Sequence, residues 1–422
     1  MSNYKLFFSM GPALSLVFLM LANAAHSQVY GCKDPLSANY NPAATVNDGS
    51  CIYNTTTYTP AAKVDPLSDT LLETSGLQMA GDFLWSFNDG GGAAAIYRMD
   101  TLTRNLLQQV NLAGAVNVDW EDIAFDGTYF YVGDFGNNAN GARTDLKIYK
   151  FPLSAIPDYN TTPVATIPAG LISTIHFSYS DQPQPPVATS SNSTKFDCEA
   201  MIVEDEKIHL FSKNWIDLNT THYEINGIAA GTYIAFPLET LATNYLVTAA
   251  DKGNGKKVVV LLGYKVVAPA NHYMHLLTDY SGGKYFNGNK RQIDLPNVTV
   301  MGQAEGITFR TGTYGYISNE RYTYLSFFTI AQKLRSFDIS NYIPAVASVY
   351  NFTGNGNWED AANWNNNTMP PASVMTGSEI IIDPLTGGTC SLNTSYTVSP
   401  GAKFTIATGK SFVVHGGLNL AK

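Results

Sequence analysis

The stretch "DWEDIAFDGTYFYVGDF", residues 119–135, has a form that recurs along the chain. Two polar residues flank one spacer, and Leu, Ile or Met follows shortly after them. A turn marked by Gly, Asp or Glu then leads into an apolar, aromatic-rich run that ends in a polar residue. Comparable stretches are "ETSGLQMAGDFLWSFND" from Glu73, "DCEAMIVEDEKIHLFSK" from Asp197, "QAEGITFRTGTYGYISNE" from Gln303 and, more weakly, "LVTAADKGNGKKVVVLLGY" over 246–264.

The second polar positions of these copies are Ser75, Glu121, Glu199, Asp251 and Glu305, which lie 46, 78, 52 and 54 residues apart. Such periods, with about four short strands in each, are typical of β-propellers. A Pro/Ser-rich surface loop at 181–194 accounts for the long second interval, and amphipathic runs of helical length are absent.

The sequence therefore predicts an all-β chain with a propeller of five four-stranded blades over 65–348. A sixth blade stays open if residues 52–66 add strands. Residues 54–64 are a linker, or instead close the ring by pairing with the last blade. The last unit is expected to include strands at 324–330 and 333–339.

Each blade begins with the strand nearest the central channel, so acids recurring there place carboxylates around one channel end. Like charges in a confined mouth raise one another's pKa unless a cation or a basic group compensates them. Calcium, with six to eight oxygen ligands, is the expected cation; Lys213, Arg143, Lys290 and Arg291 are the alternative. The candidate metal ligands are Glu121, Glu199, Glu305, Asp119, Asp197 and Asp251, with Asp122 beside them. Further ligand-binding candidates are Glu73, Asp89, Asp134, Lys213 and Glu320.

Two other interpretations of these acids remain open. They can be structural and bond backbone amides of neighbouring strands, or they can perform acid–base catalysis. Trp85, Tyr131 and Trp215 lie near the ends of second strands, where packing between blades is the default and stacking on sugars the alternative.

The motifs "SGL…LW…ND…IYRMD", "DWEDIAFDG…YVGD" and "EGITF…YISNE" resemble the SdiA-regulated, YjiK-like propellers and the related esterase-like phytase propellers. The resemblance covers about two thirds of the chain and implies an exported propeller with calcium near the blade-start acids. Ser75 in the first copy and Gln303 in the last depart from a full ring of acidic ligands.

The N-terminal residues predict an export signal over 1–27. Lys5 precedes the apolar run "LSLVFLMLA", and "AAHS" supplies small residues before Gln28. Residues 28–53 follow as a short polar module in which Cys32 and Cys51 are expected to pair. Its Asp and Asn residues indicate a turn cluster, with a calcium loop as the alternative. The pattern "GC…DP…NYNP…DGSC" resembles a module of exported Bacteroidota proteins.

Composition narrows the choice of partners. A net charge of −9 argues against nucleic acid and anionic membranes, and no apolar run after the signal is long enough to span a bilayer. Cys198 and Cys390 are expected to be single buried thiols. We expect a secreted or outer-surface protein, with the periplasm as the alternative, and a small-molecule or glycan ligand.

The composition changes at residue 349, where Trp358 and Trp364 lie among Asn and Gly. The short strands that follow, over 349–422, predict a partial β-helix or β-solenoid. Few rungs are present although a solenoid needs several, so we expect a truncated chain. A sorting domain for type IX secretion is expected after such modules, which makes that machinery a candidate partner.

The functional hypothesis is an exported propeller that binds a ligand, with calcium, at an acid-lined channel mouth. One alternative is a metal-dependent hydrolase of phosphoesters or lactones, and another is an adhesin or scaffold without catalysis. G-x-S-x-G, P-loop and H-E-x-x-H motifs are absent, and the fold alone does not decide whether the chain is an enzyme.

Overall fold

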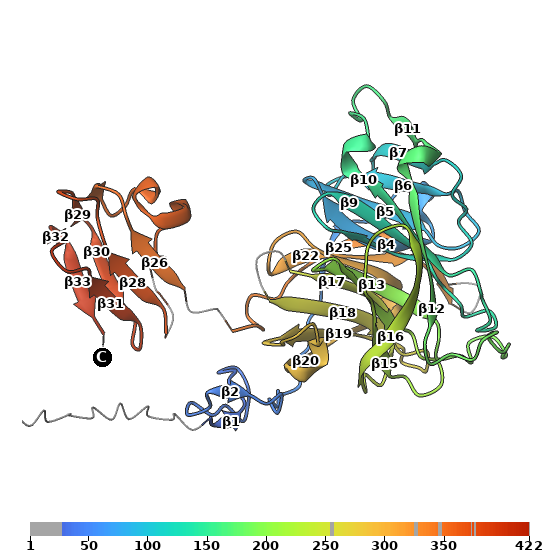
Figure 1. Cartoon of the computed structure of the whole chain (residues 1–422), viewed down its shortest axis with the longest axis horizontal. Coiled ribbons are helices and arrows are strands. Elements are labelled where there is room, and N and C mark those ends of the chain that lie inside the picture. Colours follow the sequence, from blue (N-terminus) through green and yellow to red (C-terminus); the bar gives the residue numbers. More distant parts are fainter. Residues whose placement is uncertain are drawn as a thin grey trace, which may run out of the picture.

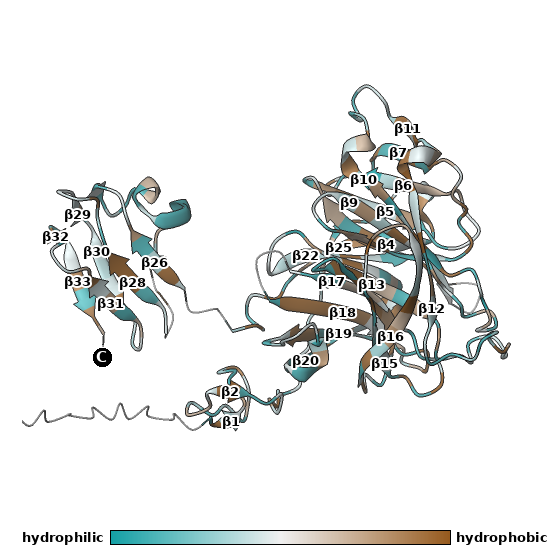
Figure 2. Cartoon of the chain, viewed as in Figure 1, coloured by the Kyte–Doolittle hydropathy of each residue, from teal (hydrophilic) through white to brown (hydrophobic). Residues whose placement is uncertain are grey.

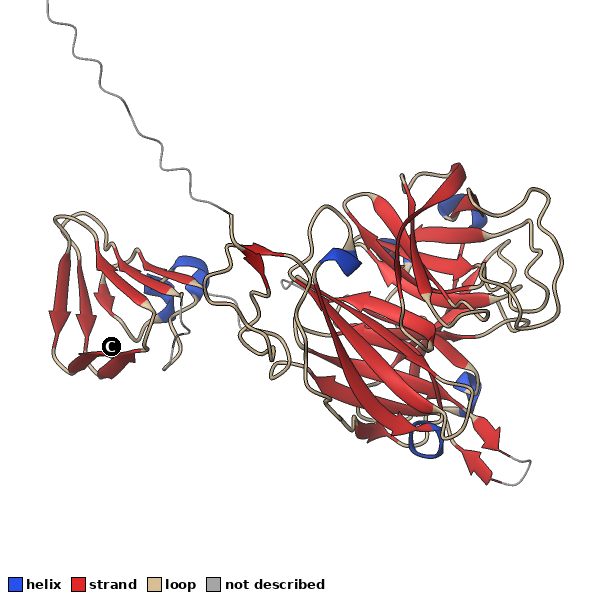
Figure 3. Ribbon diagram, turned by 90° about the horizontal axis from the view of Figure 1, so that it is seen from below, coloured by secondary structure: helices blue, strands red, loops and turns tan. Residues whose placement is uncertain are grey.

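The computed structural model describes residues 28–253, 257–324, 328–344, 348–372, 374 and 377–421. The predicted export signal, residues 1–27, lies outside the described residues. Strands dominate the described chain, and helices are few and short (Figure 3). The helical segments are η1 (Asp69–Leu71), η2 (Leu153–Ala155), η3 (Ala169–Leu171), η4 (Tyr285–Asn287), α1 (Val298–Met301), η5 (Ala361–Asn363) and η6 (Asn365–Asn367).

The central part is a β-propeller of five blades, each with four antiparallel strands (Figure 1). From the inner to the outer strand, the first two blades are β4 (Thr74–Ala80), β5 (Phe83–Asn88), β6 (Ala95–Met99) and β7 (Leu106–Leu112), then β8 (Trp120–Phe125), β9 (Tyr129–Asp134), β10 (Lys147–Pro152) and β12 (Ser173–Tyr179). The third and fourth are β13 (Cys198–Glu204), β14 (Lys207–Ser212), β15 (Thr220–Ile225) and β16 (Gly231–Leu241), then β17 (Leu246–Lys252), β18 (Val258–Tyr264), β19 (Asn271–Thr278) and β20 (Asn289–Asn297). The fifth is β21 (Gln303–Phe309), β22 (Tyr314–Glu320), β25 (Lys333–Asp338) and β3 (Ala61–Val64).

The blades form a closed ring in which each inner strand packs against the next: β4, β8, β13, β17, β21 and β4 again. Five hydrophobic clusters lie between the five pairs of adjacent blades. Between the first two blades, for example, Trp85 contacts Phe130 and Phe87 contacts Trp120 edge to face. Strands buried on both faces are almost wholly apolar, as Figure 2 shows for β18.

The ring is closed by the beginning of the propeller sequence. β3 pairs antiparallel with β25, with Val64 opposite Leu334, and so becomes the outer strand of the fifth blade. Because β3 occupies this edge, the strand expected at 324–330 does not join the blade. Its described residues instead belong to a separate hairpin, β23 (Tyr322–Tyr324) and β24 (Phe328–Ile330).

Two parallel pairings connect neighbouring blades in a way that the repeat does not predict. β11 (Val164–Ile167) leaves the second blade and pairs with β7 of the first. β12 of the second blade pairs with β16 of the third, with Ile175 opposite Gly231. The outer strands of three blades, β7, β12 and β16, are thereby paired on both sides, which protects them from pairing with other chains.

The N-terminal module contains β1 (Tyr30–Gly31), β2 (Val46–Asn47) and the disulfide between Cys32 and Cys51. Its polar side chains bond turns of the module itself: Asp34 accepts from Leu36 N and from the Tyr53 hydroxyl. The module also contacts the fourth blade, where Asn47 Nδ2 donates to Asn289 Oδ1 at 2.8 Å.

The C-terminal segment forms three short parallel sheets, which makes it solenoid-like. The sheets contain β26 (Val349–Phe352), β28 (Glu379–Ile382) and β31 (Lys403–Ile406); β27 (Gly356–Asn357), β29 (Thr389–Leu392) and β32 (Ser411–Val414); and β30 (Ser395–Val398) with β33 (Gly417–Leu420). Its own core includes Trp358, Trp364 and Leu392.

Candidate metal centre

Each inner strand carries a β-bulge near its start, and in four of the five blades the bulge contains the residue that the sequence repeat singles out. The register shifts fall between Thr74 and Leu77, Trp120 and Asp122, Cys198 and Ala200, Val247 and Ala249, and Ala304 and Gly306. A bulge leaves its extra residue unpaired and redirects the side chain. The residues at these five positions are Ser75 (with Gly76), Glu121, Glu199, Thr248 and Glu305.

Three of the five bulge residues are glutamates, and all three are buried, with exposed fractions of 5% for Glu121, 3% for Glu199 and 7% for Glu305. The two neutral members bond the next blade. Ser75 Oγ donates to Glu121 O at 2.8 Å, and Thr248 Oγ1 donates to Ala304 O at 3.0 Å. Two of the five bulge residues thus join adjacent blades, and the other three supply carboxylates.

The carboxylates that converge most closely come from two blades. One oxygen each of Asp89, Asp119 and Glu121 lie within 4.8 Å of one another, and this is the only group of acidic, His or Cys side chains in the described residues that meets this geometry. Asp89 follows β5, whereas Asp119 and Glu121 begin the next blade. We call these three residues the carboxylate triad.

The electrostatics of the triad disfavour three free negative charges. Burial, reinforced by Glu199 and Asp89, raises the pKa of Glu121 well above its usual value. Burial and the charges of Asp89 and Asp197 raise the pKa of Asp119 to about 7. Burial likewise raises the pKa of Asp89. A cation placed among them would reverse these shifts.

Two features characterise the surroundings of the triad oxygens. Within the described residues, the Glu121 and Asp119 carboxylates accept no hydrogen bond from a protein donor. Gly136 lies against both, and a methyl group there would overlap Glu121 Oε1 and Asp119 Oδ2. Only glycine at position 136 therefore lets the backbone lie this close to the two carboxylates.

Basic groups compensate the rest of the mouth. Lys213 Nζ lies 2.6 Å from Glu199 Oε2, and both side chains are at most 5% exposed. The charge of Asp134 is balanced by Arg143 at 2.8 Å and Lys147 at 3.0 Å. Of the compensating groups expected from the sequence, Lys213 and Arg143 lie here.

Lys290 and Arg291 lie elsewhere. Lys290 bonds carbonyls of Gly49, Phe286 and Gly288, and Arg291 bonds Tyr342 O. Neither side chain reaches the acids of the mouth.

Several of the predicted acids are held by protein donors. Asp197 accepts from Asn137 N at 2.7 Å and from Trp215 Nε1 at 2.8 Å. Asp122 accepts from Met201 N, in the inner strand of the next blade, at 2.7 Å. These contacts are the structural role that the sequence left open.

The last blade adds two acids to the mouth. Glu305 Oε1 accepts from Gln303 Nε2 at 2.7 Å and from the Tyr264 hydroxyl at 3.4 Å. Burial and the charge of Glu305 raise the pKa of Glu320 to about 9. Glu73 is exposed at the rim.

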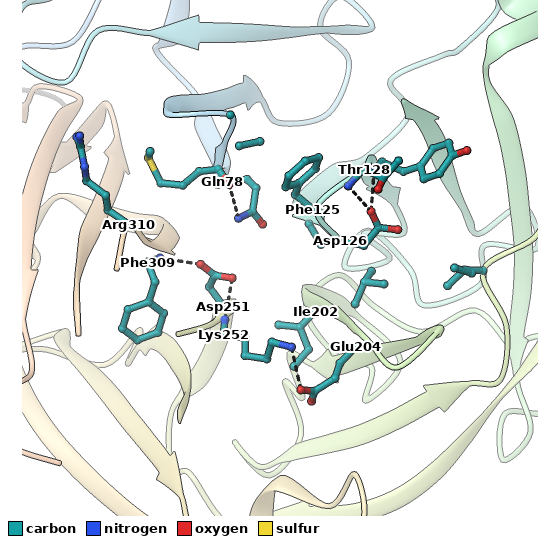
Figure 4. Close-up of a pocket in the computed structure, with 18 of the residues that line it drawn as sticks. Gln78, Phe125, Asp126, Thr128, Ile202, Glu204, Asp251, Lys252, Phe309 and Arg310 are labelled. Carbon is teal, nitrogen blue, oxygen red and sulfur yellow. Dashed lines mark hydrogen bonds and ion pairs between the residues drawn. The ribbon is translucent and has the colours of Figure 1, made fainter. Parts of the chain in front are cut away.

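Asp251 does not belong to this end of the channel. It lies three residues beyond the bulge at Thr248 and lines a pocket of about 690 Å³ around the other ends of the inner strands (Figure 4). Its Oδ2 accepts from Phe309 N and from Thr308 Oγ1. The fourth repeat has Thr248 instead of an acid at the bulge. Asp251 is the nearest acid in that strand, so the sequence pattern pointed to it instead. No member of the carboxylate triad lines this pocket, and none lines the smaller cavity at the mouth.

The mouth has a cavity of its own, of about 620 Å³, next to Lys213. Trp215, predicted as a packing or stacking residue, lines it and is half-buried. Trp85 and Tyr131 are instead fully buried between blades. Asn138 and Asn192, which the sequence did not indicate, line the cavity as well.

Cys198 and Cys390 are both buried free thiols. Burial raises the pKa of each, to about 12 for Cys390. His272 and His275 are buried in β19, and burial lowers the pKa of each to about 4. The described residues contain no helix long and apolar enough to cross a membrane.

The chain matches no protein-family model and no curated protein sequence. Solved structures that it resembles include a chain of a mitotic checkpoint complex, at 12% identity and a TM-score of 0.28, which covers 62% of this chain and 63% of that one. The PQQ-bound aldose sugar dehydrogenase from Streptomyces coelicolor matches at 10% identity and a TM-score of 0.36, covering 65% of this chain and 96% of that one. The α-L-arabinofuranosidase from Podospora anserina in complex with cellotriose matches at 9% identity and a TM-score of 0.35. The match covers 67% of this chain and 96% of that one. At these scores the likenesses identify no function, and the propeller rests on the strand pairing described above.

Proposed function

We propose that this chain is an exported ligand-binding propeller that holds a calcium ion at the carboxylate triad. The observation that carries the proposal is the convergence of Asp89, Asp119 and Glu121 within 4.8 Å, with Glu121 buried and not hydrogen-bonded by any described protein donor. An ionised carboxylate in such a place is costly unless a cation pairs with it.

The oxygen-only donor set favours a hard cation. Calcium binds six to eight oxygens at flexible geometry, whereas three carboxylates supply three to six. Coordination by the triad would thus leave positions for water or for oxygen atoms of a ligand. Gly136 supports this arrangement because it lets the backbone approach both Asp119 and Glu121.

Export is part of the proposal and rests on two observations. The first 27 residues have the composition of a cleavable signal. The disulfide between Cys32 and Cys51 suits an oxidising compartment outside the cytoplasm.

Thermal unfolding of the chain from Gln28 to Lys422, in EDTA and across a calcium titration, tests the cation site. A ligand that binds only the folded state at 100 times its Kd stabilises it by about 2.7 kcal/mol, which corresponds to about 5 °C for a domain of this size. We expect Asp119→Asn and Glu121→Gln to abolish the shift.

The matched control is Asp82→Asn. Asp82 is an exposed acid in the turn between β4 and β5, at the other end of the channel. It should retain the full calcium response. A midpoint that does not rise with calcium in the unmodified chain, or one that rises equally in all variants, contradicts the proposal.

A further inference from the structure

The cavity at the mouth combines aromatic and amide side chains. Three aromatic residues line it, Trp215, Tyr264 and Tyr322, together with three carboxamides, Asn138, Asn192 and Gln303. None of its lining residues is acidic. Aromatic faces with a few convergent polar groups are the usual composition of small-molecule sites.

The floor of the cavity is formed by side chains that already have polar partners, and its charges are balanced. Trp215 is fixed by its Nε1 bond to Asp197, and Lys213 Nζ lies 5.2 Å from the Trp215 ring and 5.5 Å from the Tyr264 ring. The Lys213 charge is already compensated by Glu199. The floor therefore offers ring faces rather than a free charge.

Two carboxamide side chains that line the cavity, those of Asn138 and Asn192, are available to hydrogen-bond a ligand. Asn192 N donates to Asn138 O at 2.8 Å, which joins the loop at 181–194 to the loop after β9. Neither side-chain amide of this pair makes a hydrogen bond with a described residue. Each can both donate and accept.

We propose that this cavity binds a saccharide. A sugar ring has apolar C–H faces that pack on aromatic rings and a rim of hydroxyl groups that pair with carboxamides. A purely apolar ligand would leave the amides of Asn138 and Asn192 desolvated and unpaired, which is costly. A polyanion would need unpaired cations, and Lys213 is paired; Lys265 at the rim is the remaining ammonium group among the lining residues.

The saccharide deepens the proposed ligand-binding function, because the cavity lies next to the carboxylate triad. Asn138 is two residues beyond Gly136, which packs on Asp119 and Glu121. Lys213, which lines the cavity, also interacts electrostatically with Asp89 of the triad. We expect oxygen atoms of a sugar bound at this edge of the cavity to be further ligands of the proposed ion.

The test is isothermal titration of the chain from Gln28 to Lys422 with neutral, N-acetylated and uronic-acid oligosaccharides, in calcium and in EDTA. We expect at least one class to bind. Tyr322→Ala and Asn192→Ala, both outside the blade cores, should weaken that binding at least tenfold. Tyr129→Ala is the control: Tyr129 is a 37% exposed aromatic residue at the other end of the channel, and its loss should change nothing.

Absence of binding by all three classes overturns the inference, as does binding that neither cavity variant weakens. Calcium binding at the triad is tested separately, by the shift of the unfolding midpoint with calcium. Saccharide binding that persists in EDTA and in Asp119→Asn supports the cavity while separating it from the ion. Binding lost in EDTA places sugar oxygens on the ion.

Discussion

The buried ion pair between Lys213 and Glu199 allows the electrostatics of the mouth to be tested without any ligand. Both side chains are at most 5% exposed and their charged atoms are 2.6 Å apart. Lys213→Met leaves the Glu199 carboxylate without its cation, among other acids. Removing one partner of a buried pair costs about 3–5 kcal/mol.

The pH dependence of this loss has a defined sign. Burial and neighbouring carboxylates already hold the pKa of Glu199 well above its usual value, and Lys213 is the largest opposing influence. Without Lys213, Glu199 stays protonated in the folded state but ionises on unfolding. Stability of the variant should therefore fall as pH rises, by about 1.4 kcal/mol per unit.

Urea unfolding in EDTA at pH 6 and pH 8 measures this effect. Lys213→Met should lose more stability between pH 6 and pH 8 than the unmodified chain does, by at most about 2–3 kcal/mol, because removal of Lys213 raises the folded-state pKa of Glu199 further. The double variant Lys213→Met with Glu199→Gln removes both charges and should recover most of the loss at both pH values. If the double variant is as unstable as the sum of the two single variants, the two charges are not coupled and the reasoning fails.

Three further outcomes are expected. Asp122→Ala should lower the free energy of unfolding by about 1–3 kcal/mol, because the buried Met201 amide loses its acceptor, while the calcium shift of the melting midpoint stays intact; loss of that shift would make Asp122 part of the ion site. His275, whose pKa burial lowers to about 4, contributes stability above pH 6.5 that is lost as pH falls through 4. Urea titrations should show His275→Gln losing about 2–3 kcal/mol less than the unmodified chain between pH 7 and pH 4.5, and parallel losses would refute this. Replacing Cys32 and Cys51 together by Ser should destabilise the N-terminal module by about 3 kcal/mol in the chain-entropy model, seen as faster amide exchange confined to residues 28–53; unchanged exchange there would show that the disulfide is not needed.

The repeat predicted the positions of Glu121, Glu199 and Glu305 because each blade starts with the same strand, turn and strand. It failed at Asp251, since the fourth blade has Thr248 at the bulge. A bulge is defined by strand register, which depends on pairing between residues far apart in the sequence.

The composition of the site was predictable only in part. Asp89 and Asp119 were both candidates, yet their convergence depends on two blades meeting, which no local pattern records. Asn192 comes from an inserted loop and Tyr322 from an added hairpin. Neither segment belongs to the repeat, so no pattern in the sequence places the two residues together.

The closure of the ring by β3 makes the last blade depend on both ends of the propeller sequence. β25 and β3 pair only after nearly all of the intervening chain has been made. Contacts of such large sequence separation form slowly, and until then β25 presents an unpaired edge to other chains. The first strand of the propeller must therefore wait for the last blade, and the propeller is most exposed to misassembly just before its ring closes.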